Sequence, residues 1–288
     1  MPSTTDSKIN RTRLLTFLGT LVVSWLGFEL LSFVLNVRMV QLAPAYMFTP
    51  LLAGGVTILR SDVGVRDVGL RMGRGRWLAL AAVTPLVLAG LVTGLSVLLP
   101  GIDFSPGQSL LPWLQLPEGV LGILAAVVVV LGLGVTINAV LAFGEEFGWR
   151  GYLLWELAPL GFWRASALIG AIWGLWHAPV IVEGYNYPSF PLVGVLVMTG
   201  ATIAFSFLYT YLVLRADSVL AAVFFHGVFN ASGGLILVWT AAETAALSQL
   251  VASPVGAASM AVFLLVAVGI AVAGTPELRR GTLFDGTR

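Results

Sequence analysis

The sequence has no cysteine, only two histidines and few charged residues. Asp, Glu, Lys and Arg make up 10% of its 288 residues, and hydrophobic residues make up 58%, whereas soluble domains are about 25% charged. The missing cysteines exclude disulfides, thiolate metal sites and a cysteine nucleophile. The shortage of charge excludes a water-soluble fold, so the composition predicts an integral membrane protein.

Apolar runs along the chain are long enough to cross about 30 Å of hydrocarbon at about 1.5 Å per residue. They cover residues 14–36, 42–59, 77–99, 120–143, 165–182, 192–214, 219–239 and 251–273. These runs predict an all-α polytopic membrane protein of about eight transmembrane helices, with a single transmembrane domain over 14–274. The polar tails 1–13 and 275–288 are expected to be mobile.

Lysine and arginine set the orientation, because positive charge in short loops stays in the cytoplasm. With a cytoplasmic amino end, Arg38 is the single one of the 15 Lys and Arg residues that falls on the outer side. A miscounted helix would move the lysines and arginines of all later loops to the opposite side of the membrane. Both tails are therefore predicted to be cytoplasmic, and with no organelle signal we expect a multi-pass protein of a prokaryotic plasma (inner) membrane.

Ionisable groups in apolar spans cost several kcal/mol and mark candidate functional sites. The first group is AFGEEFGWRG, at the end of the fourth run. Glu146 and Arg150 are four residues apart and are predicted to pair on one helix face, which leaves Glu145 the freer carboxylate. Such a buried carboxylate can act as a general base on water. The alternative is that this segment only ends a helix at the interface.

Two further segments place polar side chains four residues apart on one helix face. Trp173 and His177 form one pair and His226 and Asn230 the other. A single histidine in an apolar helix is more often a packing residue, but here both histidines lie in such helices. The His226 and Asn230 pair can donate to an oxyanion or bind a metal. Both histidine helices enter from the predicted cytoplasmic side, so we expect the site to open there.

Taken together, the three segments resemble the CPBP family of CAAX proteases and bacteriocin-processing enzymes, also called the Abi family. Its pattern is Glu-Glu-x-x-x-Arg, then an aromatic-x-x-x-His, then His-x-x-x-Asn on successive membrane helices. The matching residues here are Glu145, Glu146, Arg150, Trp173, His177, His226 and Asn230. Trp173 stands where Phe is usual, and the family-like core covers about residues 118–239.

This resemblance implies an intramembrane endopeptidase. Glu145 with His177 would polarise a water that attacks the scissile carbonyl, and His226 with Asn230 would hold the oxyanion. Glu146 and Arg150 would fix the geometry of their helix. The implied partners are the lipid bilayer and a peptide or membrane-protein substrate, with or without an attached lipid, and no nucleic acid.

The resemblance leaves the cofactor open, because the family has been described both as metal-dependent and as glutamate-dependent without metal. A divalent metal such as zinc would take its ligands from Glu145, His177, His226 and Asn230. The His-Glu-x-x-His signature of many zinc proteases is absent.

Two other function classes would use the same side chains. A proton or divalent-cation carrier would bind its ion at the buried Glu and His residues, and it predicts inverted repeats and broken helices that the sequence does not show clearly. A non-catalytic membrane scaffold or immunity-type protein would keep the fold alone, and the complete polar set argues against it.

Overall fold

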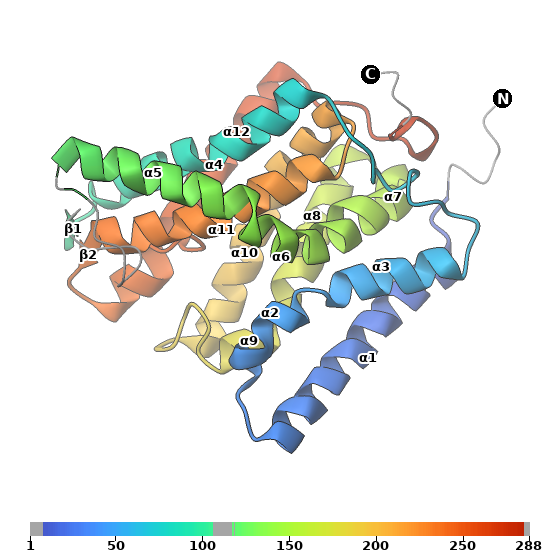
Figure 1. The fold of residues 1–288 in the computed structure, drawn as a ribbon, viewed down its shortest axis with the longest axis horizontal. Coiled ribbons are helices and arrows are strands. Elements are labelled where there is room, and N and C mark those ends of the chain that lie inside the picture. The colour runs from blue at the N-terminus through green and yellow to red at the C-terminus, as the bar shows by residue number, and fades with distance from the viewer. Residues whose placement is uncertain (1–7, 106–116, 118, 285–288) are drawn as a thin grey trace.

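The computed structural model describes residues 8–105, 117 and 119–284, and this part of the chain is almost entirely helical (Figure 1). The longer α-helices are α1 (Arg11–Leu35), α3 (Thr49–Leu59), α4 (Gly75–Ser96), α5 (Gly119–Val135), α6 (Ile137–Glu146), α8 (Gly161–Trp176), α10 (Pro191–Ala216), α11 (Leu220–Trp239) and α12 (Ala257–Ala273). The all-α polytopic class is confirmed.

Short segments join these helices. They are η2 (Met39–Leu42), α2 (Ala43–Tyr46), the π-helical turn η3 (Phe147–Leu153), α7 (Leu154–Leu157), η4 (Ala158–Leu160), α9 (Ala178–Val182), the π-helical turn η5 (Leu247–Val251) and η6 (Arg280–Thr282). Strand β1 (Ile102–Phe104) pairs antiparallel with β2 (Thr240–Ala242), with Asp103 opposite Ala241.

Among the described residues, five helices are long and apolar enough to cross a membrane. A sixth span results if the bent pair Met39–Tyr46 and Thr49–Leu59, which meet at 43°, counts as one. Helices α5 and α12 are shorter, with 17 residues each. The number of eight spans therefore stays a prediction.

The end of the fourth predicted run at residue 143 is wrong. The backbone breaks earlier, at Thr136, where φ is −115° and ψ is −94°. From Ile137 the helix then continues through Glu145 and Arg150. It need not stop at the first charged residue, because the bundle interior supplies partners for these side chains.

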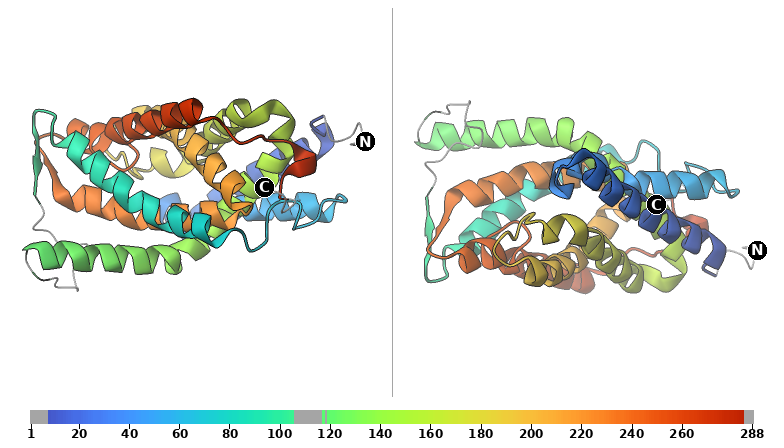
Figure 2. Two further views of the ribbon diagram at one scale, coloured as in Figure 1. Left: turned by 90° about the horizontal axis from the view of Figure 1, so that it is seen from above. Right: turned by 90° about the horizontal axis from the view of Figure 1, so that it is seen from below.

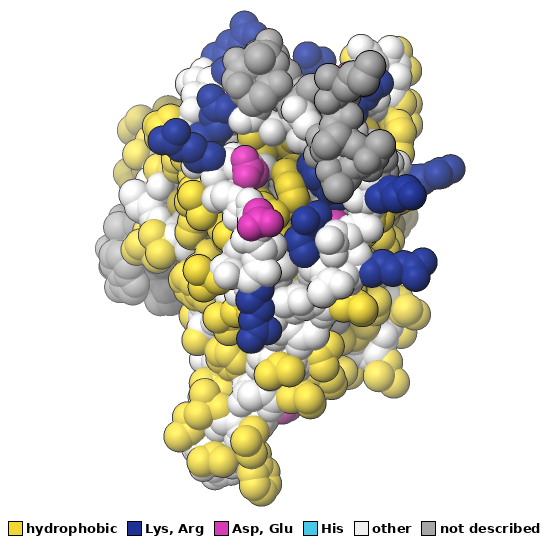
Figure 3. Space-filling view, turned by 90° about the vertical axis from the view of Figure 1, so that its right-hand side faces the viewer, with side chains coloured by type: hydrophobic (Ala, Val, Ile, Leu, Met, Phe, Trp, Pro, Cys, Tyr) yellow, Lys and Arg dark blue, Asp and Glu magenta, His cyan; other side chains and the backbone are white. Residues whose placement is uncertain are grey.

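The two ends of the bundle differ in charge. We call residues 8–13, 60–76, 158–164, 215–220 and 275–284 the arginine-rich end; Arg71 pairs there with Asp217 at 3.3 Å. The arginine-poor end consists of residues 36–42, 97–105, 183–190 and 240–256, including β1 and β2. Figures 1 and 2 show β1 and β2 on the side opposite to α7 and the red carboxyl-terminal segment. Figure 3 looks onto the side of α7 and the carboxyl-terminal segment, where dark blue side chains gather.

Close helix contacts bring the two histidine helices into the centre. Helix α8 packs along α10, and α11 packs against α4, α5 and α6. A Cβ at Gly174 would overlap Thr199 of α10, and one at Gly227 would overlap the backbone of Gly134. Small residues at such positions let helices approach closely. As a result, His177 and His226, which lie within three residues of these glycines, face a common interior.

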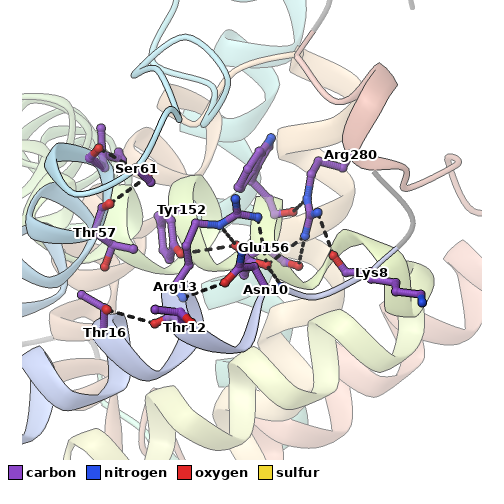
Figure 4. A network of polar contacts seen from close by, with 12 residues as sticks. Lys8, Asn10, Thr12, Arg13, Thr16, Thr57, Ser61, Tyr152, Glu156 and Arg280 are labelled. Carbon is purple, nitrogen blue, oxygen red and sulfur yellow. Dashed lines mark hydrogen bonds and ion pairs between the residues drawn. The ribbon is translucent and has the colours of Figure 1, made fainter. Parts of the chain in front are cut away.

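Glu156 joins both ends of the described chain to the segment that follows Arg150 (Figure 4). Its side chain is fully buried. It accepts from Arg13 Nε at 2.7 Å, from Arg280 Nη2 at 2.9 Å and from the backbone N–H of Asn10 at 2.7 Å. Three donors on one carboxylate satisfy a buried charge that would otherwise be costly.

The carboxyl-terminal segment therefore differs from the expectation of a mobile tail. Leu278, Leu283 and Phe284 are buried together with Arg280, which also donates to the carbonyl of Lys8 at 2.9 Å. The expectation is wrong for residues 275–284, because apolar burial and the Glu156 carboxylate hold them in place. Residues 1–7 and 285–288 lie outside the described part of the chain.

Arg13→Ala is expected to lower the thermal unfolding temperature of the purified protein. It removes the Arg13 to Glu156 ion pair, and hydrogen bonds to charged groups contribute roughly 1.5–3 kcal/mol. The matched control is Arg11→Ala, which makes the same charge change on an exposed side chain two residues away. If both variants unfold at the same temperature, Glu156 does not hold the amino-terminal helix in this way.

Candidate active site

A cavity of about 290 Å³ lies between α8, α10 and α11. Four of the predicted site residues line it, namely Trp173, His177, His226 and Asn230. The other polar lining residues are Asn138, Tyr185, Asn186 and Thr202. The structure thus brings the second and third sequence segments to one place, as their spacing predicted.

Each histidine is fixed through its Nδ1 atom. His177 Nδ1 lies 2.8 Å from the backbone oxygen of Trp173, and His226 Nδ1 lies 2.8 Å from Glu146 Oε1. A carbonyl and a carboxylate only accept, so Nδ1 donates in both rings. The Nε2 atoms are therefore the nitrogens left for a ligand in the cavity.

Glu146 and Arg150 form the predicted pair, fully buried below the cavity. Arg150 Nη1 donates to Glu146 Oε1 at 3.1 Å, and Nη2 donates to Ser206 Oγ at 2.8 Å. The guanidinium lies between two aromatic rings, 4.3 Å from Trp173 and 4.4 Å from Tyr209. The charge distribution predicts Arg150 on the inner side with the loop arginines, but Arg150 lies in the interior, where Glu146 balances its charge.

Glu145 is the other carboxylate, and it is 2% exposed. Its Oε2 accepts from Trp173 Nε1 at 2.6 Å. Within the described residues, Oε1 has no hydrogen-bond donor and no basic residue forms an ion pair with Glu145. Glu145 is not among the side chains that line the cavity, and Trp173 connects the two. Glu146 has ion-pair partners, while Glu145 has none among the described residues. This confirms the prediction that Glu145 is the freer carboxylate.

The arrangement offers two kinds of polar group to a molecule in the cavity. His177 and His226 present ring nitrogens, while Asn230 and Asn138 present amides. Among the described residues, no three His, Cys, Asp or Glu side chains come close enough to hold a metal ion together. The predicted divalent metal stays a prediction.

Sequence reasoning missed Asn138 and Ser206. Asn138 is an amide inside an apolar run, seven residues before Glu145 and so on nearly the same helix face; its polarity alone could have drawn attention to it. Ser206 is one of many small hydroxyl residues in α10, and only the packing of α10 against η3 shows that it accepts from Arg150.

One side of the cavity reaches the loops of the arginine-poor end. The lining residues Tyr185, Asn186, Pro254 and Val255 belong to or adjoin these loops. Among the described residues, none from the arginine-rich end lines the cavity. The opening on the cytoplasmic side stays a prediction.

Comparisons with known proteins agree with the site. Residues 123–232 match the family model described as Type II CAAX prenyl endopeptidase Rce1-like, and all seven predicted site residues lie in this interval. The chain is also 30% identical over 101 residues to the protein named CAAX prenyl protease 2 of Methanococcus maripaludis. That alignment covers 33% of this chain and 37% of the relative, so it spans little more than a third of the relative's length.

Proposed function

From a chain whose residues 123–232 match the Rce1-like model of type II CAAX prenyl endopeptidases, we propose an endopeptidase that hydrolyses a peptide bond within a prokaryotic plasma membrane. The observation that carries this proposal is the joint position of the polar groups. Two histidines with fixed Nδ1 atoms share one cavity with Asn230, and two buried carboxylates lie directly behind them.

In this proposal Glu145 is the general base. Its Oε1 has no donor within the described residues, while the Trp173 N–H holds Oε2. A carboxylate fixed at one oxygen and free at the other can take a proton from a water molecule. His177, fixed through Nδ1 and open at Nε2, would accept a hydrogen bond from the same water. The hydroxide so formed attacks the scissile carbonyl carbon.

The attack converts the carbonyl oxygen into an oxyanion that needs donors. The Asn230 amide donates directly, and an imidazolium at His226 would donate from Nε2 while Nδ1–H stays on Glu146. Preorganised donors of this kind are commonly the largest contribution to acyl-transfer catalysis. The C–N bond then breaks, the proton taken by Glu145 passes to the leaving amine, and a carboxylate and an amine result.

Glu146 and Arg150 position the catalytic groups and do not touch the substrate. Arg150 neutralises Glu146, which in turn orients His226. Active-site histidines are commonly held by a hydrogen bond to a carboxylate. Here Glu146 is that carboxylate, and Arg150 holds it in place. A metal would have to draw its ligands from Glu145, His177, His226 and Asn230, and no step above uses one.

The function is tested by turnover of a quenched peptide library, with lipidated and unlipidated members, by the purified protein in detergent. Cleavage of one or more library members is the expected outcome. A parallel assay with chelator reports whether a metal is required. No cleavage by folded protein would favour the scaffold or the cation carrier, which use the same buried residues without hydrolysis.

Trp173→Phe is expected to lower kcat roughly tenfold with little change in KM. The change keeps the ring but removes the N–H donor to Glu145, and a hydrogen bond to a charged acceptor contributes roughly 1.5–3 kcal/mol. The matched control is Trp163→Phe, on the same helix with an outward-facing ring that is 37% exposed. A lower unfolding temperature with unchanged kcat would make Trp173 a packing residue and contradict its positioning role.

A further inference from the structure

Three arginines that the proposed hydrolysis does not use lie together at the arginine-rich end. Arg74 and Arg76 are at the start of α4, and Arg215 is in the last turn of α10. The backbone N–H of Arg74 donates to the carbonyl of Ala216 at 2.8 Å, and its Nη1 donates to the carbonyl of Arg215 at 3.5 Å. These bonds hold the start of α4 against the end of α10. We call Arg74, Arg76 and Arg215 the arginine cluster.

Aromatic rings orient two of the three guanidinium groups. The Arg215 guanidinium lies 5.0 Å from the ring centre of Tyr211 and 5.9 Å from that of Trp77, and the Arg76 guanidinium lies 5.9 Å from the same Trp77 ring. The two rings pack edge to face at 6.0 Å. Tryptophan and tyrosine are enriched where a membrane meets water. Cation–π contacts orient a guanidinium but leave its positive charge in place.

No carboxylate neutralises the arginine cluster within the described part of the chain. Its three members take part in none of the ion pairs there. Asp217, two residues after Arg215, pairs with Arg71 instead. Two buried donors of this corner, Trp77 Nε1 and Arg215 Nε, also have no acceptor among the described residues, which is unfavourable for a buried polar group. The corner therefore has an excess of positive charge and of hydrogen-bond donors.

An exposed apolar stripe runs along α4 from the arginine cluster. Arg76, Leu80, Val83 and Val87 follow the spacing i, i+4, i+7, i+11, which places them on one helix face. The three apolar side chains are between 47% and 59% exposed, and α4 is long and apolar enough to cross a membrane. From Arg76 to Val87 the helix rises about 16 Å at about 1.5 Å per residue. This is close to one leaflet, half of about 30 Å of hydrocarbon.

We propose that the arginine cluster binds the headgroup of an anionic phospholipid, whose acyl chains lie along Leu80, Val83 and Val87. The guanidinium groups of Arg76 and Arg215 donate to the phosphate oxygens, a pairing that suits the planar fork of arginine. A zwitterionic lipid has the same phosphate, but its cationic amine cancels the charge that attracts the arginines. A net negative headgroup is therefore preferred. The proposal is independent of peptide hydrolysis.

Native mass spectrometry of the purified protein tests this site. The protein is released from detergent that contains equal amounts of phosphatidylglycerol and phosphatidylcholine with identical acyl chains. We expect phosphatidylglycerol adducts to dominate in the wild type. Arg76→Gln should lower the ratio of the two adducts roughly fivefold, the attraction of one arginine to anionic lipid, and Arg76→Gln combined with Arg215→Gln should lower it further.

The matched control is Arg164→Gln, which removes an exposed arginine from the first turn of α8 at the same end of the bundle. Its adduct ratio should equal that of the wild type. Because Arg76 is exposed, Arg76→Gln should unfold at the wild-type temperature, so it decides the matter even if loss of Arg215 destabilises the end of α10.

Three results would overturn the proposal. One is equal retention of both lipids by the wild type, and another is the same loss of preference in Arg164→Gln, which would reduce the effect to overall charge. The third comes from adding inorganic phosphate at the concentration of phosphatidylglycerol. If this phosphate displaces the lipid, the arginine cluster binds a soluble anion and the stripe on α4 contributes nothing.

Discussion

Glu145→Gln is expected to reduce peptide turnover roughly 10²–10⁴-fold, the usual contribution of a positioned general base, while the unfolding temperature stays the same. The substitution keeps the size of the side chain and an oxygen that can accept from Trp173 Nε1. It removes only the ability to take a proton from water. Turnover of the quenched peptide library and a thermal melt of the same sample measure both quantities.

The matched control for this change is Glu29→Gln, a carboxyl-to-amide substitution on α1. Glu29 accepts from Trp25 at 3.0 Å and does not line the cavity, so turnover should remain at the level of the wild type. If Glu145→Gln retains full activity while His226→Ala loses it, the base is another group. If both variants lose the same amount of stability, the effect of Glu145→Gln comes from removing a carboxylate charge within a membrane helix. It would then not report on the general base.

Arg150→Ala is expected to destabilise the protein by about 3–5 kcal/mol, because breaking a buried pair leaves an uncompensated charge. Glu146 would lose the guanidinium at 3.1 Å, Ser206 would lose its donor, and Trp173 and Tyr209 would lose the cation between them. Thermal or denaturant unfolding in detergent measures the effect. Activity should fall as well, since Glu146 orients His226.

A second variant separates the lost charge from the lost volume. Glu146→Gln combined with Arg150→Met removes both charges and keeps most of the packing, and such replacements are often neutral or stabilising. The double variant should therefore be more stable than Arg150→Ala and remain inactive. Arg164→Ala, on an exposed position of α8, is the control for loss of one arginine and should stay within about 0.5 kcal/mol of the wild type. A double variant as unstable as Arg150→Ala would indicate that the stacking contributes more than the pair.

Local regularities of the sequence determined the membrane class, the pairing of Glu146 with Arg150 and the common face of His226 and Asn230. These follow from composition and from helix periodicity, which act within a few residues of the chain. The same spacing also determined that Glu145 is the carboxylate without an ion-pair partner.

Only the tertiary structure decided the contacts between helices that are distant along the chain. The indole N–H of Trp173 on Glu145, the Ser206 hydroxyl on Arg150 and the convergence of Arg13 and Arg280 on Glu156 each join residues at least 28 positions apart. The shape of the cavity belongs to this class too. It depends on which loops fold over the helix ends and on where glycines such as Gly174 and Gly227 let backbones meet, and no periodicity of a single helix contains that information.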